Sequence, residues 1–148
     1  MGTQQTLEVM AQLARQGSSV ASPVAAHLVS VRGGVADFVS NLDRFLRHNF
    51  VYREERDEVL RTVDFMLHDF NTLGRMEGDC DDMSIMSGSL LCAAGISARL
   101  TAIQSADPFE YDHVFTEARV GSDWVVVDPT VPYGTTYNTY GFMSESVC

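Results

Sequence analysis

The residue with the clearest chemical potential is Cys80, which stands in the segment Gly78-Asp79-Cys80-Asp81-Asp82. The hydrophobic pattern after it predicts a helix over 80–94, so this cysteine lies where a loop enters a helix. A helix N-terminus presents unpaired N–H groups and a partial positive charge, which favour a thiolate and could hold an oxyanion. The flanking aspartates act against this, because like charge raises the pKa of a thiol unless the carboxylates point away or pair with cations.

A nucleophilic cysteine needs a base within reach, and His113 is the histidine best placed to supply one. His27, His48 and His68 fall in helical stretches among charged residues, where surface positions explain them. His113 instead opens a predicted strand over 113–120, after a loop, so its side chain can reach the end of a sheet.

Asp128 is the candidate for the group that orients the imidazole. It ends a second predicted strand over 124–128. If the turn between the two strands is centred on Val120–Gly121, His113 lies directly opposite Asp128, with Cβ atoms about 5 Å apart. Another turn length would give another register, and Asp128-Pro129 is also a common way to begin a turn.

These residues also have simpler interpretations. A free cysteine such as Cys80 often behaves as a small buried hydrophobe. Metal binding by Asp79, Asp81, Asp82 and His113 is the weakest alternative, because the segment matches neither an EF-hand loop nor a zinc spacing. We therefore expect neither a metal nor a cofactor.

Several helices must come before this segment. The pattern predicts helices over 3–15 and from Ser22-Pro23 to about 33–34, separated by a break at 16–19. A stronger apolar stripe runs over 35–46, and Phe50 to Tyr52 should be extended. A further helix is expected over 54–67 with Val59 buried, followed by a loop at 71–74.

The second half of the chain is dominated by predicted strands. Gly95 stands where a helix-capping glycine belongs, and strands follow over 96–103, 113–120 and 124–128. Helices first and strands later predict an α+β fold with an antiparallel sheet. The tail over 131–148 either adds an edge strand or lies against a protein partner.

Length, charge and cysteine count further limit the domain number, partners and compartment that we expect. A chain of 148 residues fits one domain over 1–148, and its net charge of −10 argues against nucleic acid as a partner. No apolar run approaches the roughly 20 residues of a membrane helix, and no secretory signal is visible, which favours a cytoplasmic protein. Three cysteines are an odd and sparse set, so we expect no disulfide framework and a reducing compartment. Cys80 and Cys92, about 18 Å apart along one helix, cannot bridge.

Four stretches in order resemble the transglutaminase-like superfamily, which is related to papain. They are GDCDD at 78–82, LLCAAGISARL at 90–100, DHVFTEARV at 112–120 and WVVVDPT at 124–130. The similarity covers roughly 35–130, and one departure is Phe115, where the family usually has tryptophan.

The resemblance implies a papain-like core, in which N-terminal helices and a central cysteine-bearing helix pack on an antiparallel sheet. It also implies Cys80 as nucleophile, His113 as base and Asp128 as orienting acid, acting on a peptide or protein substrate through a thioester. We expect hydrolysis rather than crosslinking, because no accessory domain suggests binding of an amine donor. The alternative is a non-enzymatic assembly protein that keeps the fold, for example a bacteriophage virion component with the 131–148 tail as its contact surface.

Overall fold

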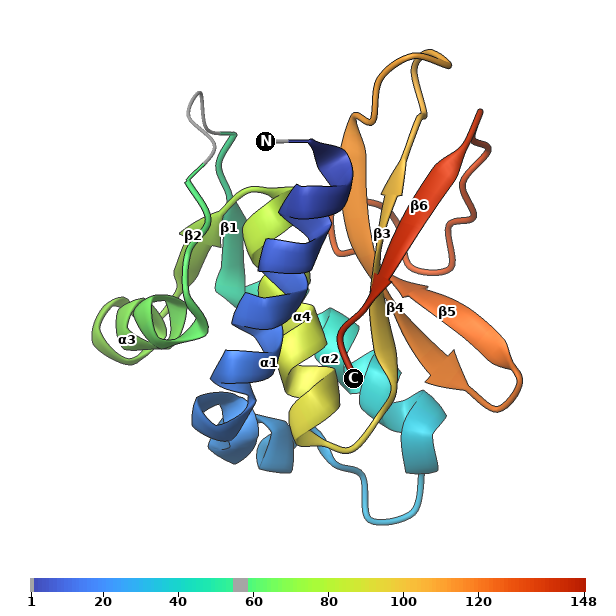
Figure 1. Ribbon diagram of the computed structural model, residues 1–148. Helices are drawn as coiled ribbons and strands as arrows, with labels where there is room; N and C mark the ends of the chain where they lie inside the picture. Colours follow the sequence, from blue (N-terminus) through green and yellow to red (C-terminus); the bar gives the residue numbers. More distant parts are fainter. Residues whose placement is uncertain (1, 55–58) are drawn as a thin grey trace.

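The computed structural model describes residues 2–54 and 59–148 and shows an α+β architecture, which confirms the predicted fold class (Figure 1). The helices are α1 (Thr3–Leu28), α2 (Gly34–Asn49), α3 (Val63–Leu73) and α4 (Cys80–Ala93). The strands are β1 (Phe50–Tyr52), β2 (Met76–Gly78), β3 (Ala98–Ile103), β4 (His113–Val120), β5 (Asp123–Val127) and β6 (Phe142–Ser146). The main sheet is antiparallel with strand order β5-β4-β3-β6, while β1 and β2 form a separate parallel pair.

Helix α4 lies at the centre, between α1 and the main sheet (Figure 1). Its small residues allow this close approach: a Cβ added to Gly88 would lie 3.5 Å from the Cβ of Ala14 in α1 and 3.4 Å from Val147. On the sheet side, Thr116 of β4 donates from its hydroxyl to the carbonyl of Ser84 at 2.9 Å. These contacts fix where α4 begins, and therefore where Cys80 lies.

Helix α1 corrects one of our predictions, because it runs without the expected break at 16–19. Gly17 is buried, and a Cβ there would come within 2.4 Å of Val63. Pro23 also lies inside the helix rather than at the start of a new one. Tertiary packing has therefore overridden the local helix-breaking signal, which is a weak one by comparison.

The segment after β1 also differs from the prediction. The expected helix over 54–67 falls partly on 55–58, which lie outside the described residues. Helix α3 begins only at Val63, capped by the Thr62 hydroxyl, and runs to Leu73 through most of the predicted loop. Val59, expected to be buried, is 58% exposed. The helix does end where glycine allows a left-handed conformation, at Gly74 with φ of 76°.

The β4–β5 hairpin is displaced by two residues from the predicted register. Val120 pairs with Asp123 and Thr116 with Val127, so the turn consists of Gly121 and Ser122. A shift of two keeps every side chain on its expected face of the sheet. Asp128 follows the last residue of β5 and is therefore a diagonal rather than a direct neighbour of His113.

The tail supplies the edge strand β6, which pairs with β3 from Arg99↔Ser146 to Ile103↔Phe142. At its end Cys148 is bonded to Cys92 of α4, 56 residues earlier. We expected no disulfide framework, and this bond was missed because partners so distant in sequence carry no local signal. The argument for a reducing compartment loses its basis, and the cytoplasmic location stays a prediction.

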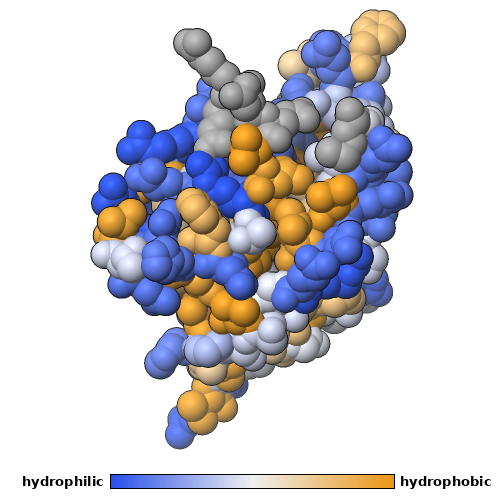
Figure 2. Space-filling model, turned by 60° about the vertical axis from the view of Figure 1, so that its left-hand side comes forward, coloured by the Kyte–Doolittle hydropathy of each residue, from blue (hydrophilic) through white to orange (hydrophobic). Residues whose placement is uncertain are grey.

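Apolar side chains also reach the surface. Figure 2 shows apolar patches between polar regions on the face that turns the left-hand side of Figure 1 forward. Exposed apolar residues of α1 and α3 include Val9, Val20 and Phe65. A folded domain ordinarily leaves a good part of its apolar atoms exposed. In the part of the chain that the structure describes, no helix combines the length and apolar character that a membrane span requires.

Candidate active site

Cys80 is the first residue of α4, as the sequence predicts. Asp79 caps the helix: its side chain accepts hydrogen bonds from the N–H groups of Asp81 and Asp82. Gly78 has no room for a side chain, since a Cβ there would lie 2.4 Å from the Asp82 carboxylate. The Gly-Asp-Cys order therefore has a local cause, with glycine for the tight entry and aspartate for the cap.

The three aspartates around Cys80 have different roles. Asp82 is fully buried, and its carboxylate pairs with the Arg61 guanidinium at 2.7 Å and accepts the N–H of Asp79. Asp81 instead lies beside the thiol, with 3.9 Å between Cys80 Sγ and Asp81 Oδ1. Only the second arrangement sets a carboxylate charge directly against the sulfur.

His113 and Asp128 lie close together. His113 Nε2 is 2.6 Å from Asp128 Oδ2, and the Asp128 side chain is 4% exposed. The second carboxylate oxygen accepts from the Thr130 N–H at 3.0 Å and from its hydroxyl at 2.6 Å. The contact thus forms despite the shifted register, because the diagonal neighbours share a face.

The loop that carries Asp128 is held from α2. Arg47 donates to the main-chain carbonyls of Asp128, Pro129 and Val131, and its guanidinium also pairs with the buried Asp43 at 2.6 Å. An arginine fixed by a carboxylate on one side and by three carbonyls on the other limits the movement of this loop.

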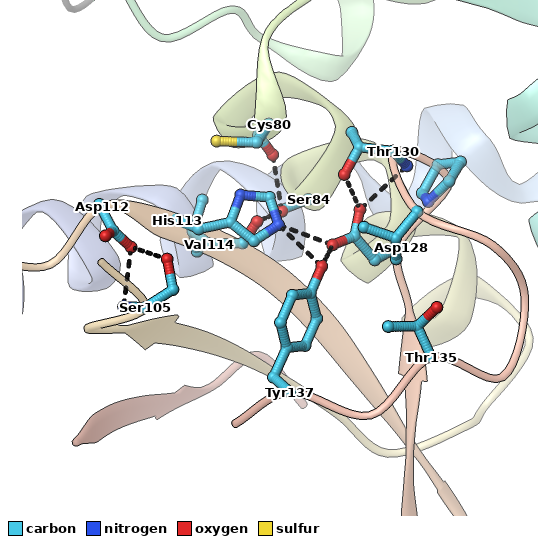
Figure 3. Close-up of polar contacts among 12 residues, drawn as sticks. Cys80, Ser84, Ser105, Asp112, His113, Val114, Asp128, Thr130, Thr135 and Tyr137 are labelled. Carbon is cyan, nitrogen blue, oxygen red and sulfur yellow. Dashed lines mark hydrogen bonds and ion pairs between the residues drawn. The ribbon is translucent and has the colours of Figure 1, made fainter. Parts of the chain in front are cut away.

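Tyr137, which sequence reasoning missed, completes the group (Figure 3). Its hydroxyl donates to Asp128 Oδ2 and lies 3.2 Å from His113 Nε2. Its ring stacks on Phe115, with centroids 4.9 Å apart. The tail is rich in tyrosine, threonine and glycine, and nothing in that composition distinguishes this tyrosine from Tyr133 or Tyr140.

Cys80 and His113 line the same cavity of about 310 Å³. Nε2 of His113 faces Asp128, and Figure 3 shows the other ring nitrogen on the side of the ring toward Cys80. In the same view the sulfur points past one side of the imidazole. The structure therefore brings all three predicted residues to one place, with the thiol turned aside.

The electrostatics differ between the two halves of the site. Burial and then the charge of Asp81 raise the pKa of the Cys80 thiol to about 12, against a lowering by a backbone hydrogen bond at Val114. The thiolate that the helix terminus was expected to favour is thus disfavoured in this arrangement. Burial also acts to raise the pKa of Asp128, but hydrogen bonds from His113, Thr130 and Tyr137 outweigh it and hold that pKa below its usual value.

The metal alternative finds no support in the geometry. Among residues 2–54 and 59–148, no three histidine, cysteine, aspartate or glutamate side chains are grouped as a metal site would require. Asp82 is committed to Arg61, and His113 to Asp128.

A cysteine at the start of a central helix, facing a histidine on an antiparallel sheet, defines the papain-like class of α+β folds. Within that class the chain belongs to the transglutaminase-like superfamily, whose family model matches residues 24–129. At the level of the family, this membership supports a thiol-dependent enzyme.

Two solved structures share the fold. One is a candidate cysteine protease from Cytophaga hutchinsonii, with a TM-score of 0.59 and 21% identity over 76% of this chain and 37% of that chain. The other is a candidate protease from Parabacteroides distasonis, with a TM-score of 0.62 and 16% identity over 83% of this chain and 26% of that chain. At such identities the likeness shows the fold alone, and this chain spans well under half the length of either protein. No curated protein matched the chain.

Proposed function

We propose that this protein cleaves peptide or side-chain amides through a thioester, with Cys80 as nucleophile, His113 as base and Asp128 as orienting acid. The observation that supports this most is the shared cavity: Cys80 and His113 both line it, while Asp128 holds the imidazole by its far nitrogen. Membership of a thiol-dependent enzyme family supports the same assignment.

The hydrogen bond to Asp128 decides which imidazole nitrogen acts as the base. An ionised carboxylate only accepts hydrogen bonds, so Nε2 of His113 carries the proton and Nδ1 keeps its lone pair. The cysteine side chain has one rotatable bond, and rotation about it redirects the sulfur toward Nδ1. The Sγ–H proton then passes to Nδ1 while the sulfur attacks the carbonyl carbon, which gives a tetrahedral oxyanion.

The raised pKa of Cys80 bears on the order of these events. A thiol with a pKa of about 12 is neutral near pH 7, so a standing thiolate does not accumulate. That pKa belongs to the thiol as it lies turned aside from the imidazole. We propose that proton transfer to His113 accompanies the attack on the carbonyl, as in general-base catalysis. Asp128 stabilises the imidazolium that forms and remains ionised.

The oxyanion needs a donor close to the sulfur. The N–H groups of Asp81 and Asp82 already donate to Asp79. Within this first turn the main-chain N–H of Cys80 is therefore the donor that we assign to the oxyanion. The sequence alone had suggested all the main-chain N–H groups around Cys80 as donors to the oxyanion, and this proposal reduces them to one.

The intermediate then collapses toward products. The C–N bond breaks, the proton on Nδ1 passes to the leaving amine, and an acyl thioester remains on Cys80. Water attacks the thioester carbonyl and gives its proton to Nδ1. The C–S bond breaks, the sulfur takes that proton back, and the acid product leaves. We propose water as the acceptor because both structural neighbours bear the name protease.

The test compares wild type with Cys80→Ala on a broad panel of peptides and amides. We expect turnover to fall by at least about 10³-fold, because covalent catalysis is lost. Mass spectrometry of quenched reactions should detect an acyl adduct on Cys80 in wild type. Equal turnover by the two proteins would exclude hydrolysis through Cys80.

The same assay separates the possible acceptors. With methylamine added at high concentration, a hydrolase still releases mainly the free acid, whereas a crosslinking enzyme releases mainly the methylamide. If neither product forms, and Cys80 reacts with iodoacetamide no faster than an ordinary buried thiol, the non-enzymatic assembly role takes the place of this proposal.

A further inference from the structure

Tyr137 contacts the candidate site but has no part in the proposed reaction steps. It comes from the segment between β5 and β6, nine residues after Asp128, and its hydroxyl contacts both His113 and Asp128. The hydroxyl has one proton, and Asp128 is the acceptor for it. Its oxygen can then accept weakly from His113 Nε2, at 3.2 Å.

The position of Tyr137 is imposed by the fold on both sides. Upstream, Arg47 holds the carbonyl of Val131. Downstream, β6 pairs with β3, and two residues after β6 the chain is bonded through Cys148 to Cys92. The ring itself is stacked on Phe115, with an angle of 11° between the planes. A side chain held in this way is placed by the surrounding structure rather than by its own loop.

From this geometry we infer that Tyr137 is a positioning residue: its hydroxyl fixes the Asp128 carboxylate so that the imidazole of His113 presents its second ring nitrogen to Cys80. The inference rests on the proposed function for its catalytic meaning. The contacts among the three side chains can nevertheless be tested without a substrate.

The Asp128 carboxylate accepts hydrogen bonds from four donors. Oδ1 takes two bonds from Thr130, and Oδ2 takes the bonds from His113 and Tyr137. With four donors the carboxylate cannot rotate without breaking bonds, and it stays ionised despite its burial. Without the Tyr137 hydroxyl, His113 Nε2 alone would hold Oδ2, and the imidazole would lose a restraint on its orientation.

Other charged or titratable groups near Asp128 are left chemically unchanged by a substitution at Tyr137. Among the described residues they include Asp43 and Arg47 from α2, Cys80 from α4 and Tyr133 from the tail. A change seen on removal of one hydroxyl can therefore be assigned to Tyr137.

The experiment compares Tyr137→Phe with Tyr140→Phe by NMR. The first variant keeps the ring and its stacking on Phe115 and removes only the hydroxyl. Tyr140 comes from the same tail, but its side chain is 65% exposed, so Tyr140→Phe is a matched control. The readouts are the carboxyl ¹³C titration of Asp128 and the ¹⁵N shifts of the His113 ring nitrogens, which report the tautomer.

In wild type we expect a downfield Tyr137 hydroxyl proton in slow exchange and His113 in the Nε2–H tautomer. In Tyr137→Phe the pKa of Asp128 should rise by about 0.5 to 1 unit, because the carboxylate loses a donor. The His113 tautomers should become mixed, and Tyr140→Phe should match wild type. Unchanged spectra in Tyr137→Phe, or no protected hydroxyl proton in wild type, would overturn the inference.

These outcomes are separable from those of the proposed function. If the NMR changes occur but Cys80→Ala leaves turnover unaltered, the proposed reaction fails and the positioning contact stands. If turnover depends on Cys80 but Tyr137→Phe changes nothing, the reaction stands and the role of Tyr137 is wrong.

Discussion

Helix α4 carries a cysteine near each end, and one is a free thiol while the other forms a disulfide. At the N-terminal end Cys80 is a free thiol that lines a cavity with His113. Near the C-terminal end Cys92 is bonded to Cys148 and ties the tail to the helix. Both sulfurs lie on one rigid element, so the difference comes from what each one faces.

This contrast shows how one helix serves two purposes. Its C-terminal end holds the tail, and the tail places Tyr137 beside Asp128. Its N-terminal end holds the sulfur near the imidazole. The disulfide at the C-terminal end is thus one of several restraints on the tail, while the thiol at the N-terminal end depends on His113 for its proposed chemistry.

The largest expected effect comes from removing the imidazole of His113. In His113→Ala we expect turnover to fall by about 10³-fold or more, because the thiol loses its base. The rate at which iodoacetamide alkylates Cys80 should then depend on pH only through the ionisation of the Cys80 thiol. With a pKa of about 12, the thiolate fraction and the rate should keep rising with pH well above 8.5.

Wild type is the control, and its alkylation should show an additional rise at lower pH that depends on the imidazole. Cys80 is the free thiol among the chain's three cysteines, all of which the structure describes, so the measurement reports it alone. Identical pH profiles in the two proteins would mean that His113 does not act on Cys80.

The next largest effect concerns the disulfide between Cys92 and Cys148. Replacing Cys92 and Cys148 together with serine should lower the free energy of unfolding by about 2–4 kcal/mol, because the bond closes a long loop in the unfolded chain. Denaturant unfolding measures this loss. Reductant should destabilise wild type by a similar amount and leave the double variant unaffected.

The same double variant tests whether the two ends are separable. The β3–β6 ladder and the contacts of Arg47 still hold the tail, so the pH profile of Cys80 alkylation should be kept under native conditions. A profile that moves with the disulfide would show that the two ends are coupled through the tail.

The closeness of His113 and Asp128 was easier to predict from the sequence than several of the surrounding elements, for a physical reason. Cys80, His113 and Asp128 lie next to local signals: a helix start, a strand start and an Asp-Pro strand end. A register error of two did not separate His113 from Asp128, because period-two alternation keeps both side chains on one face.

The features that were missed depend on contacts between distant segments. Gly17 looked like a helix break, but it lies inside α1 because Val63 packs against it. The partner of Cys92 is 56 residues away, and Tyr137 resembles the other tyrosines of the tail until the fold places it beside Asp128. Local pattern cannot show such pairings.

The smallest expected effect tests why the Cys80 thiol stays protonated. Asp81 lies beside Cys80, and its charge is the second cause of the raised thiol pKa, after burial. Asp81→Asn should lower that pKa without restoring its usual value, because the cysteine remains buried. Below the thiol pKa this means more thiolate, so alkylation at pH 8 should be about three- to tenfold faster, corresponding to a shift of 0.5 to 1 unit.

A matched control exists elsewhere in the chain. Asp64 is the second residue of α3, as Asp81 is of α4, so Asp64→Asn removes the same favourable helix-end charge far from the thiol. Both variants should lose a similar small amount of stability, and only Asp81→Asn should change the alkylation rate. Equal rates in the two variants would mean that the charge of Asp81 does not keep Cys80 protonated, and that the contrast between the two ends of α4 does not depend on this carboxylate.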